Sequence, residues 1–325
     1  MPIDRRDALA LLGLSLAGAA LPGPASAQVR QLRVGKAINS SFTFAGLELG
    51  QQRGIWKAQG LELQISAFRG DSQVQQAFAA GAIDFGFGSG PSMGYAVKGV
   101  PARAVATIAN KPANMALVVA ANSGVTRVGD LRGKRIGVTT AGSLTDWLAR
   151  KIVVSNNWKP GDLTIVPMGE MRTRLAAMRG GDIAGAVTAV QEAYEIQNKG
   201  LGKVLMTFAD VVPHFITHAI FARDALITGE PDVVRRLLKG WFTVAAFMRS
   251  NRAVTVKSVA ATMRLSEQVI DQTYQLETSM LSVDGRFEAS ALDVIRTSLK
   301  DLGILTYVPA ATALYSGLFV PVTVG

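Results

Sequence analysis

The sequence predicts an α/β fold with two lobes. Short apolar strands alternate with helical segments along most of the chain, a pattern that favours largely parallel sheets. A similar local plan occurs twice, ending at Gly81–Gly86 and again at Gly181–Ala186. The chain has 325 residues, which is too long for one comfortable hydrophobic core. Two similar lobes are the simplest explanation, although any two strand–helix–strand units share such general features.

The first two thirds of the chain carry the alternation. Apolar runs of strand length are followed by segments in which apolar residues recur at helical spacing. We expect strands at 32–37, 61–68, 83–87, 115–120, 133–138, 163–166 and 184–188, and helices at 44–53, 73–80, 144–154 and 172–178.

Beyond His218 the pattern becomes mostly helical. One strand is expected at 219–222, and Pro231 suits the first turn of a long helix. Further helices are expected at 254–263, 267–279 and 289–302, whereas the apolar tail, 310–325, has no clear pattern. Because terminal helices usually pack back on the first lobe, we expect lobe 1 to comprise 28–120 plus 218–325 and lobe 2 to comprise 121–217. Two chain crossings would then form a hinge.

The first 27 residues have the features of an export signal. Arg5 and Arg6 precede an apolar run, 8–21, and the small residues 25–27 resemble a cleavage site. The apolar run is shorter than the roughly 20 residues that a spanning helix needs, which disfavours a retained anchor. The paired arginines suggest the twin-arginine route, with the ordinary secretory route still open. We therefore expect a periplasmic location.

Composition narrows the classes of function. The chain has no cysteine, which excludes disulfides, thiolate metal sites, a thiol nucleophile and a lipidated cysteine. The formal net charge is +10, which suits an anionic solute but also simply favours solubility. Nucleic acid is a poor partner for an exported protein. No metal or other cofactor is expected.

Several segments together resemble a known family. They are 32–35, 54–63, 79–86, 123–125, 130–138 and 142–143, which span nearly the whole chain after the signal. In these segments the chain is similar to the sulfonate/nitrate/taurine-type substrate-binding proteins of ABC importers, relatives of the thiamine-pyrimidine synthesis proteins. The sequence departs from the family at Ala184, where an aspartate is common, and at Glu192–Tyr194, where a Glu-Pro pair is frequent.

The resemblance implies a fold and a function. The fold would be the type II periplasmic binding protein fold, with two βαβ lobes joined by a two-crossing hinge. The protein would bind a small solute between its lobes by hinge closure, act as a monomer without covalent chemistry, and deliver the solute to the membrane permease subunits of an ABC importer.

The ligand is expected at loops that follow the strands, since α/β folds bind ligands beyond the carboxyl ends of their strands, near helix N-termini. Small hydroxyl residues and glycines dominate these loops. The candidates are Ser40, Ser41, Phe42, Arg69, Asp71, Ser89, Gly90, Thr139, Thr140, Ser143, Gly169, Thr188, Glu192 and His214.

Each candidate has an alternative role. Serine and threonine also cap helices for stability alone, and Ser89, Thr140 and Ser143 are the strongest ligand candidates among them. Arg69 could pair bidentately with an anionic head group, or instead with Asp71 in its own loop. Phe42 could stack on a planar ligand and His214 could bond to one, or either could be ordinary lining.

Enzyme motifs occur only in isolation. Residues 90–94 match the G-x-S-x-G pattern, but a hydrolase also needs a histidine base held by a carboxylate. His214 and His218 are four residues apart and lack an obvious third metal ligand. The remaining alternatives are a thiamine-pyrimidine-synthase-like enzyme and a periplasmic sensor subunit. For the ligand, we expect a sulfonate-like organic anion, with an aromatic carboxylate or a pyrimidine as the alternatives.

Overall fold

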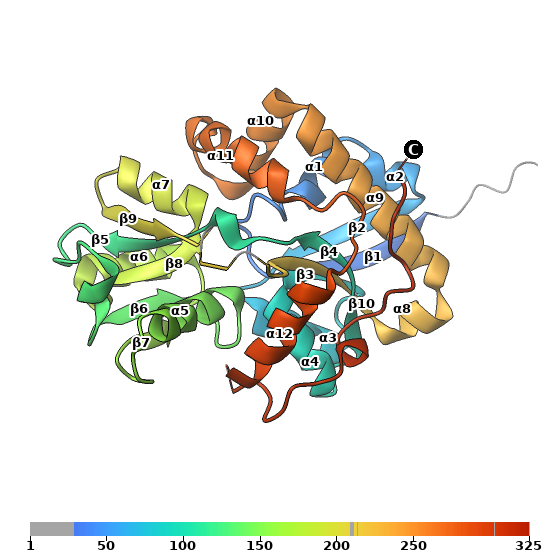
Figure 1. Ribbon diagram of the computed structural model, residues 1–325. Coiled ribbons are helices and arrows are strands. Elements are labelled where there is room, and N and C mark those ends of the chain that lie inside the picture. The colour runs from blue at the N-terminus through green and yellow to red at the C-terminus, as the bar shows by residue number, and fades with distance from the viewer. Residues whose placement is uncertain (1–28, 209–210, 213, 302, 325) are drawn as a thin grey trace, which may run out of the picture.

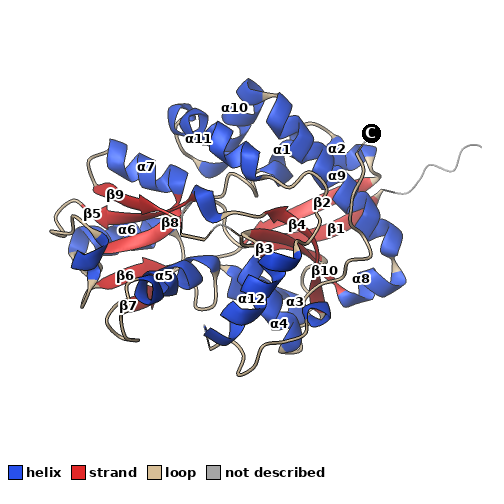
Figure 2. Cartoon of the chain, viewed as in Figure 1, coloured by secondary structure: helices blue, strands red, loops and turns tan. Residues whose placement is uncertain are grey.

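The computed structural model describes residues 29–208, 211–212, 214–301 and 303–324. Figure 1 shows two groups of strands side by side, and Figure 2 shows helices flanking each group. The expected export signal, residues 1–27, lies outside the described residues and stays a prediction.

The first sheet has five strands in the order β2-β1-β3-β10-β4. Strand β1 pairs in parallel with both β2 and β3, whereas β10 runs antiparallel to β3 and β4. Their bounds are β1 Arg30–Lys36, β2 Leu61–Ala67, β3 Phe85–Ser89, β4 Ala102–Ala109 and β10 His218–Arg223.

The second sheet repeats this plan in the order β7-β6-β8-β5-β9. Strand β6 is parallel to β7 and β8, and β5 is antiparallel to β8 and β9. The bounds are β5 Met115–Ala120, β6 Arg135–Val138, β7 Thr164–Pro167, β8 Gly185–Ala189 and β9 Gly202–Thr207. The expected α/β architecture with two lobes is confirmed.

One strand lies in the other sheet from the one we expected. The predicted boundary at residue 120 assigned 115–120 to the first lobe, but β5 pairs with β8 and β9 of the second sheet. The chain therefore crosses between β4 and β5, and it returns between β9 and β10. The apolar pattern of 115–120 identified a buried strand but carried no information about its partners.

Helices cover both sheets. In chain order, α1 is Gly46–Gln52, α2 Ile55–Ala58, α3 Asp71–Ala79, α4 Gly94–Val97, α5 Leu144–Ser155, α6 Met171–Gly180 and α7 Val190–Asn198. The C-terminal helices are α8 Asp224–Gly229, α9 Pro231–Ser250, α10 Arg252–Met263, α11 Glu267–Met280 and α12 Ala289–Asp301. Most expected elements form within a few residues of their predicted bounds, whereas the strands β4 and β9 and the helices α2, α4, α7 and α8 were not predicted. None of the helices in the described part combines the length and hydrophobicity that crossing a bilayer requires.

The larger core fills the first lobe and continues into the second, where it includes Leu131, Ile136 and Ile152. The apolar face predicted for α9 is buried and packs on α1, with Trp241 against Phe87 at a centroid distance of 4.9 Å. Helix α11 reaches from this lobe to α7 of the second lobe (Figure 1). A helix of one lobe thus touches the other lobe directly.

The apolar tail, 310–325, in which no pattern was recognised, packs back on the first lobe. Leu314 is fully buried, and Tyr315 forms an isolated bridge with Ala104 of β4. The backbone N–H of Val322 donates to the carbonyl of Asp284 at 2.9 Å. Apolar residues such as Leu314 and Phe319 therefore belong to the core, whereas Leu318 is exposed.

Candidate functional site

Two neighbouring cavities lie between the lobes. The inner cavity has a volume of about 50 Å³ and is lined by both sheets and by α11. The outer cavity has a volume of about 470 Å³. Residues adjacent in the sequence line the two spaces, such as Ser41 in the inner cavity and Ser40 in the outer one.

Six of the sequence-predicted residues line the inner cavity: Ser41, Phe42, Asp71, Ser89, Thr139 and Thr188. They come from the carboxyl-terminal ends of β3, β6 and β8 and from the segments after β1 and β2. The structure thus brings together residues that are up to 147 positions apart, at the strand ends where the sequence argument placed them.

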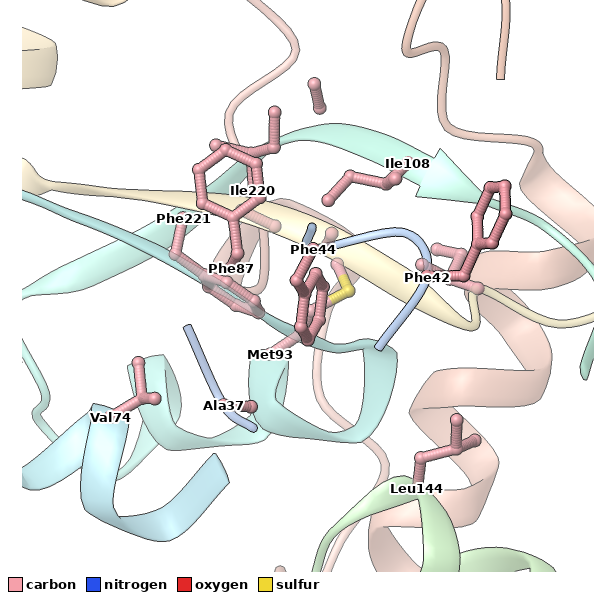
Figure 3. Packing of buried hydrophobic residues seen from close by; sticks show 14 of the residues in the cluster. Ala37, Phe42, Phe44, Val74, Phe87, Met93, Ile108, Leu144, Ile220 and Phe221 are labelled. Carbon is pink, nitrogen blue, oxygen red and sulfur yellow. The ribbon is translucent and has the colours of Figure 1, made fainter. Parts of the chain in front are cut away.

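The apolar wall of the inner cavity is aromatic on the first-lobe side. Phe42 and Phe44 follow β1, and Leu144 approaches from the second lobe (Figure 3). Phe44 packs edge-on against Phe87 of the core, with ring centroids 6.3 Å apart, and against the ring of His218 at 4.9 Å. This packing holds the wall rigidly, because core side chains leave little room for movement.

Asp71 begins α3 and faces the cavity. Its carboxylate accepts the backbone N–H of Ser89 at 2.8 Å, which joins the start of α3 to the end of β3. Burial raises the pKa of Asp71, partly offset by this hydrogen bond. The expected alternative, an ion pair between Asp71 and Arg69, does not form among the described residues. Arg69 is exposed and lines the outer cavity instead.

A cluster of hydroxyl groups forms the second-lobe rim. Thr139 Oγ1 lies 2.9 Å from Ser143 Oγ and 2.8 Å from Thr145 Oγ1. Ser143 caps α5 by accepting the N–H of Asp146, and it does not line either cavity. Its position is that of a structural cap. Thr140 packs against Gly70 of the first lobe, where an added Cβ would lie 2.3 Å from the threonine methyl group.

The outer cavity contains three other predicted residues, Ser40, Arg69 and Glu192. Glu192 is nearly buried and accepts a hydrogen bond from the hydroxyl of Thr188. Burial raises the pKa of Glu170, and repulsion from Glu192 adds to that rise. Basic and acidic groups therefore share this space.

Besides Thr140 and Ser143, three more of the predicted residues line neither of these cavities. Gly90 is packed so tightly that an added Cβ would lie 2.0 Å from the Ile216 carbonyl oxygen, so its role is close backbone contact. Gly169 has a left-handed φ of 72°, which a glycine adopts without strain. His214 is exposed in the segment that returns to the first lobe, so the structure does not bring it to either cavity to bond to a ligand.

Sequence reasoning missed a buried cation in this cavity. Arg174 lies on α6, is 1% exposed and lines the inner cavity. Its Nη1 donates to the Val187 carbonyl at 2.5 Å, and its Nε has no hydrogen-bond partner among the described residues. Burial lowers the pKa of Arg174, while Glu192 and Glu170 oppose that effect. In the described part of the chain, Arg174 forms no ion pair within 4.0 Å.

A buried carboxyl group was also missed. Glu277 on α11 is 1% exposed, and burial raises its pKa to about 7. It accepts hydrogen bonds from Gln191 of α7 at 2.5 Å and from Asn114 at 3.1 Å. The contacts link helices that belong to different lobes.

His218, at the start of β10, completes the lining. Burial lowers its pKa to about 4, so the imidazole is neutral at ordinary pH, and its Nδ1 has no partner among the described residues. The G-x-S-x-G serine, Ser92, is 1% exposed and lies 3.3 Å from the Ser89 hydroxyl. Among the described residues there is no cluster of three potential metal ligands.

Solved structures with the same fold include binding proteins. The alkanesulfonate-binding protein SsuA from Xanthomonas axonopodis pv. citri, bound to MOPS, aligns with a TM-score of 0.74 at 17% identity, covering 87% of this chain and 96% of that one. The periplasmic nitrate-binding protein NrtA from Synechocystis PCC 6803 aligns with a TM-score of 0.65 at 13% identity, covering 76% and 70%. A DSZB mutant in complex with biphenyl-2-sulfinic acid aligns with a TM-score of 0.65 at 16% identity, covering 90% and 97%. At these identities the likeness establishes the fold alone.

Sequence comparison points in the same direction. A protein of Brucella abortus (strain 2308), named "Putative binding protein BAB2_1146", is 27% identical over 230 residues, which is 70% of each chain. The family model described as NMT1/THI5 like matches residues 41–251, which include most strands of both sheets and most residues around the inner cavity, although not Glu277. The chain therefore belongs to the NMT1/THI5-like family, and its fold is that of the periplasmic sulfonate- and nitrate-binding proteins.

Proposed function

We propose that this protein is an extracytoplasmic receptor that binds a small organic anion between its two lobes and delivers it to an ABC importer. The observation that carries the proposal is Arg174, a buried guanidinium that lines the inner cavity without a carboxylate in ion-pair distance in the described chain. The fold and the family support the receptor class.

The argument from Arg174 is electrostatic. Removing a charge from water costs several kcal/mol, and a close counter-ion normally offsets most of that cost. Lys36, the other buried cation nearby, has such a partner in Glu48 at 2.5 Å. Arg174 has one backbone carbonyl and two carboxylates that act only from a distance. A sulfonate or carboxylate of the ligand would supply the missing contact through charge-assisted hydrogen bonds.

The rest of the cavity suits the organic part of such a ligand. Phe42, Phe44 and Leu144 offer apolar contact, and the hydroxyls of Ser41, Ser89 and Thr188 offer directional hydrogen bonds. Arg69, which we expected to hold the anionic group, lies in the outer cavity and would act there at the entrance.

The mechanism follows from the placement of the site. Both lobes line the inner cavity, so a ligand that contacts both would favour the closed arrangement by its higher affinity for that state. The closed monomer would then dock on the permease subunits in the membrane. No covalent step is needed, and export to the periplasm would follow from the predicted signal.

A neutral, planar ligand is the second candidate. The aromatic wall and the neutral His218 favour it, because an imidazole with a free Nδ1 can bond to a heterocycle such as a pyrimidine. Such a ligand would leave Arg174 without a counter-ion, which is why we rank it below an anion. A periplasmic sensor role would use the same cavity, and identification of the membrane partner by pull-down would distinguish it from transport.

A thermal-shift screen tests the proposal. The protein without residues 1–27 is refolded to remove carried-over ligand and exposed to alkyl and aryl sulfonates, nitrate, small carboxylates and pyrimidines. A ligand at 100 times its Kd adds about 2.7 kcal/mol of stability, which raises the midpoint visibly. A selective rise with sulfonates or carboxylates is expected. A rise with pyrimidines alone would refute the anion assignment.

A further inference from the structure

Three buried polar side chains connect the lobes beside the inner cavity. Glu277 lies on α11, Gln191 on α7 of the second lobe, and Asn114 in the segment that leads into β5. Both carboxylate oxygens of Glu277 accept a hydrogen bond, Oε1 from Gln191 at 2.5 Å and Oε2 from Asn114 at 3.1 Å. All three side chains are at least 97% buried, so this interlobe cluster is cut off from water while the lobes are together.

The cluster lacks a cation. Within the described residues, Glu277 forms no ion pair, and the groups that contact its carboxyl are neutral amides and the hydroxyl of Thr43. The charged and titratable groups on the elements packed around α11 and across the cavity have other positions or partners. On α7, Glu192 accepts a hydrogen bond from Thr188, and Glu195 forms an ion pair with Lys199. Arg249 of α9 donates to the Leu281 carbonyl, Arg252 of α10 forms an ion pair with Asp271 of α11, and Lys257 lies on α10. Asp71, Arg174 and His218 lie across the cavity.

The amide oxygens beside Glu277 lack donors. Asn114 Oδ1 and Gln191 Oε1 are both buried and have no hydrogen-bond partner among the described residues. A charged carboxylate cannot donate to them, whereas a protonated carboxyl group has one O–H to donate. Turning the Asn114 amide about its last torsion would bring its oxygen to the position of its nitrogen, where it could accept that O–H. Such amide orientations are assigned from the hydrogen-bond network.

We propose that Glu277 takes up a proton when the lobes close, so that closure of the receptor is linked to pH. The inference rests on the hinged receptor proposed above. In the open state Glu277 would lose its contact with Gln191 and gain water, which restores an ordinary carboxylate. In the closed state the neutral carboxyl group satisfies the cluster without a buried charge.

The direction of the pH effect follows from linkage. The pKa of Glu277 is raised from 4.5 to about 7 by burial, so the closed state binds the proton more tightly than the open state. The closure constant therefore increases as the pH falls below about 7, by at most about tenfold per pH unit, and this gain disappears above that pH. Three other groups that line the two cavities modify the curve. Asp71 and Glu170, whose pKa values are raised by burial, act in the same direction as Glu277, whereas His218, with its lowered pKa, opposes closure below its ordinary pKa of 6.5.

Closure can be measured directly because the chain has no cysteine. Cysteines introduced at Val154 on α5 and Val254 on α10, which are 64% and 41% exposed, would carry a fluorescence transfer pair across the lobes. The separation of the dyes is measured from pH 8.5 to pH 6.5 without ligand, in the otherwise unchanged protein and in Glu277→Gln. Glu267→Gln is the matched control, since it makes the same change at an exposed position of the same helix.

The expected result is a change of dye separation as the pH falls through about 7 in the parent protein and in the Glu267→Gln control. Glu277→Gln, whose neutral amide mimics the protonated carboxyl group, should give the low-pH separation at every pH. A separation independent of pH in the parent, or the same pH step in Glu277→Gln, overturns the proposal. Since no ligand is present, these outcomes are distinct from a failed ligand screen, which would count against the receptor itself.

Discussion

Replacement of Arg174 by methionine should separate ligand binding from stability. Methionine keeps much of the length of the side chain and removes the charge, so the packing of the stem against β6 is largely retained. That packing is close: an added Cβ at Gly137 would lie 3.1 Å from Cγ of Arg174. Two opposing effects act on the ligand-free protein. The Val187 carbonyl loses its donor, at a cost of about 1–3 kcal/mol, and the burial of an unpaired charge is relieved.

The effect on binding should be large and one-sided. A hydrogen bond to a charged group contributes about 1.5–3 kcal/mol, and each 1.4 kcal/mol is a factor of ten in Kd. We therefore expect Arg174→Met to weaken binding of an anionic ligand by about 10- to 150-fold, while the free energy of unfolding without ligand changes by no more than about 2 kcal/mol. Arg174→Lys keeps the charge but loses the planar guanidinium group, so its affinity for the anion should lie between that of the parent protein and that of Arg174→Met.

Isothermal titration with the anion that gives the largest thermal shift measures the change, and chemical denaturation measures stability. Arg179→Met is the control, because Arg179 is an exposed residue in the last turn of the same helix. Binding by Arg174→Met that equals binding by the control would show that Arg174 does not contact the ligand. An equal loss of affinity for neutral and anionic ligands would mean that the substitution only distorts the cavity.

Three further predictions concern other parts of the chain. Gly90→Ala should lower the melting temperature, because the added Cβ would lie 2.0 Å from the Ile216 carbonyl oxygen and would force the backbone to shift. Such a shift costs about 1–3 kcal/mol, and a melting temperature equal to that of the parent would contradict this prediction. Ala184→Asp should raise stability by up to about 1 kcal/mol through a new pair with Arg135, and the gain should shrink in high salt. Protein secreted from a bacterium with the twin-arginine route should begin at Gln28, and mass spectrometry of the periplasmic fraction would reveal any other start.

The sequence predicted eight of the ten strands, all except β4 and β9, because each of the eight carries its own apolar signal. Strand β5 forms at the predicted residues, and α5 begins at the predicted Leu144, although Ser143, which we favoured as a ligand residue, is its N-cap. The assignment of β5 to a lobe failed, since strand pairing depends on distant residues such as Gly185 and Gly202 of β8 and β9. Local pattern identifies an element, whereas its neighbours are decided by packing.

The two charged residues that matter most in the cavity had a detectable signal. Arg174 falls on the same helix face as Met171, Ala177 and Met178, which are all buried. Glu277 similarly falls on the face of α11 that buries Ile270 and Tyr274. A charged residue at an apolar position of a helix is rare unless it is paired or functional. The sequence favours Arg69 instead, because its loop follows a strand. Such a loop lies near the cleft, but its place in the sequence does not determine how deeply each side chain is buried.

The position of Ala184 at the start of its strand explains why the chain can lack the aspartate that is common there in the family. In the first lobe, Asp84 precedes β3 and accepts hydrogen bonds from Arg33 and Arg223, and its backbone N–H donates to the Arg33 carbonyl at 2.8 Å. In the second lobe the N–H of Ala184 donates to the Arg135 carbonyl, also at 2.8 Å, so the two positions are equivalent.

Both positions stand at the start of their strands, whereas the inner cavity lies at the strand ends, near Ser89 and Thr188. Ala184 and Arg135 line a separate cavity there. An aspartate at position 184 would therefore lie at the edge of the lobe remote from the inner cavity, and its absence does not alter the lining of that cavity. The residues that decide ligand choice in the proposed receptor should then be sought at the strand ends and at the buried charges of α6 and α11.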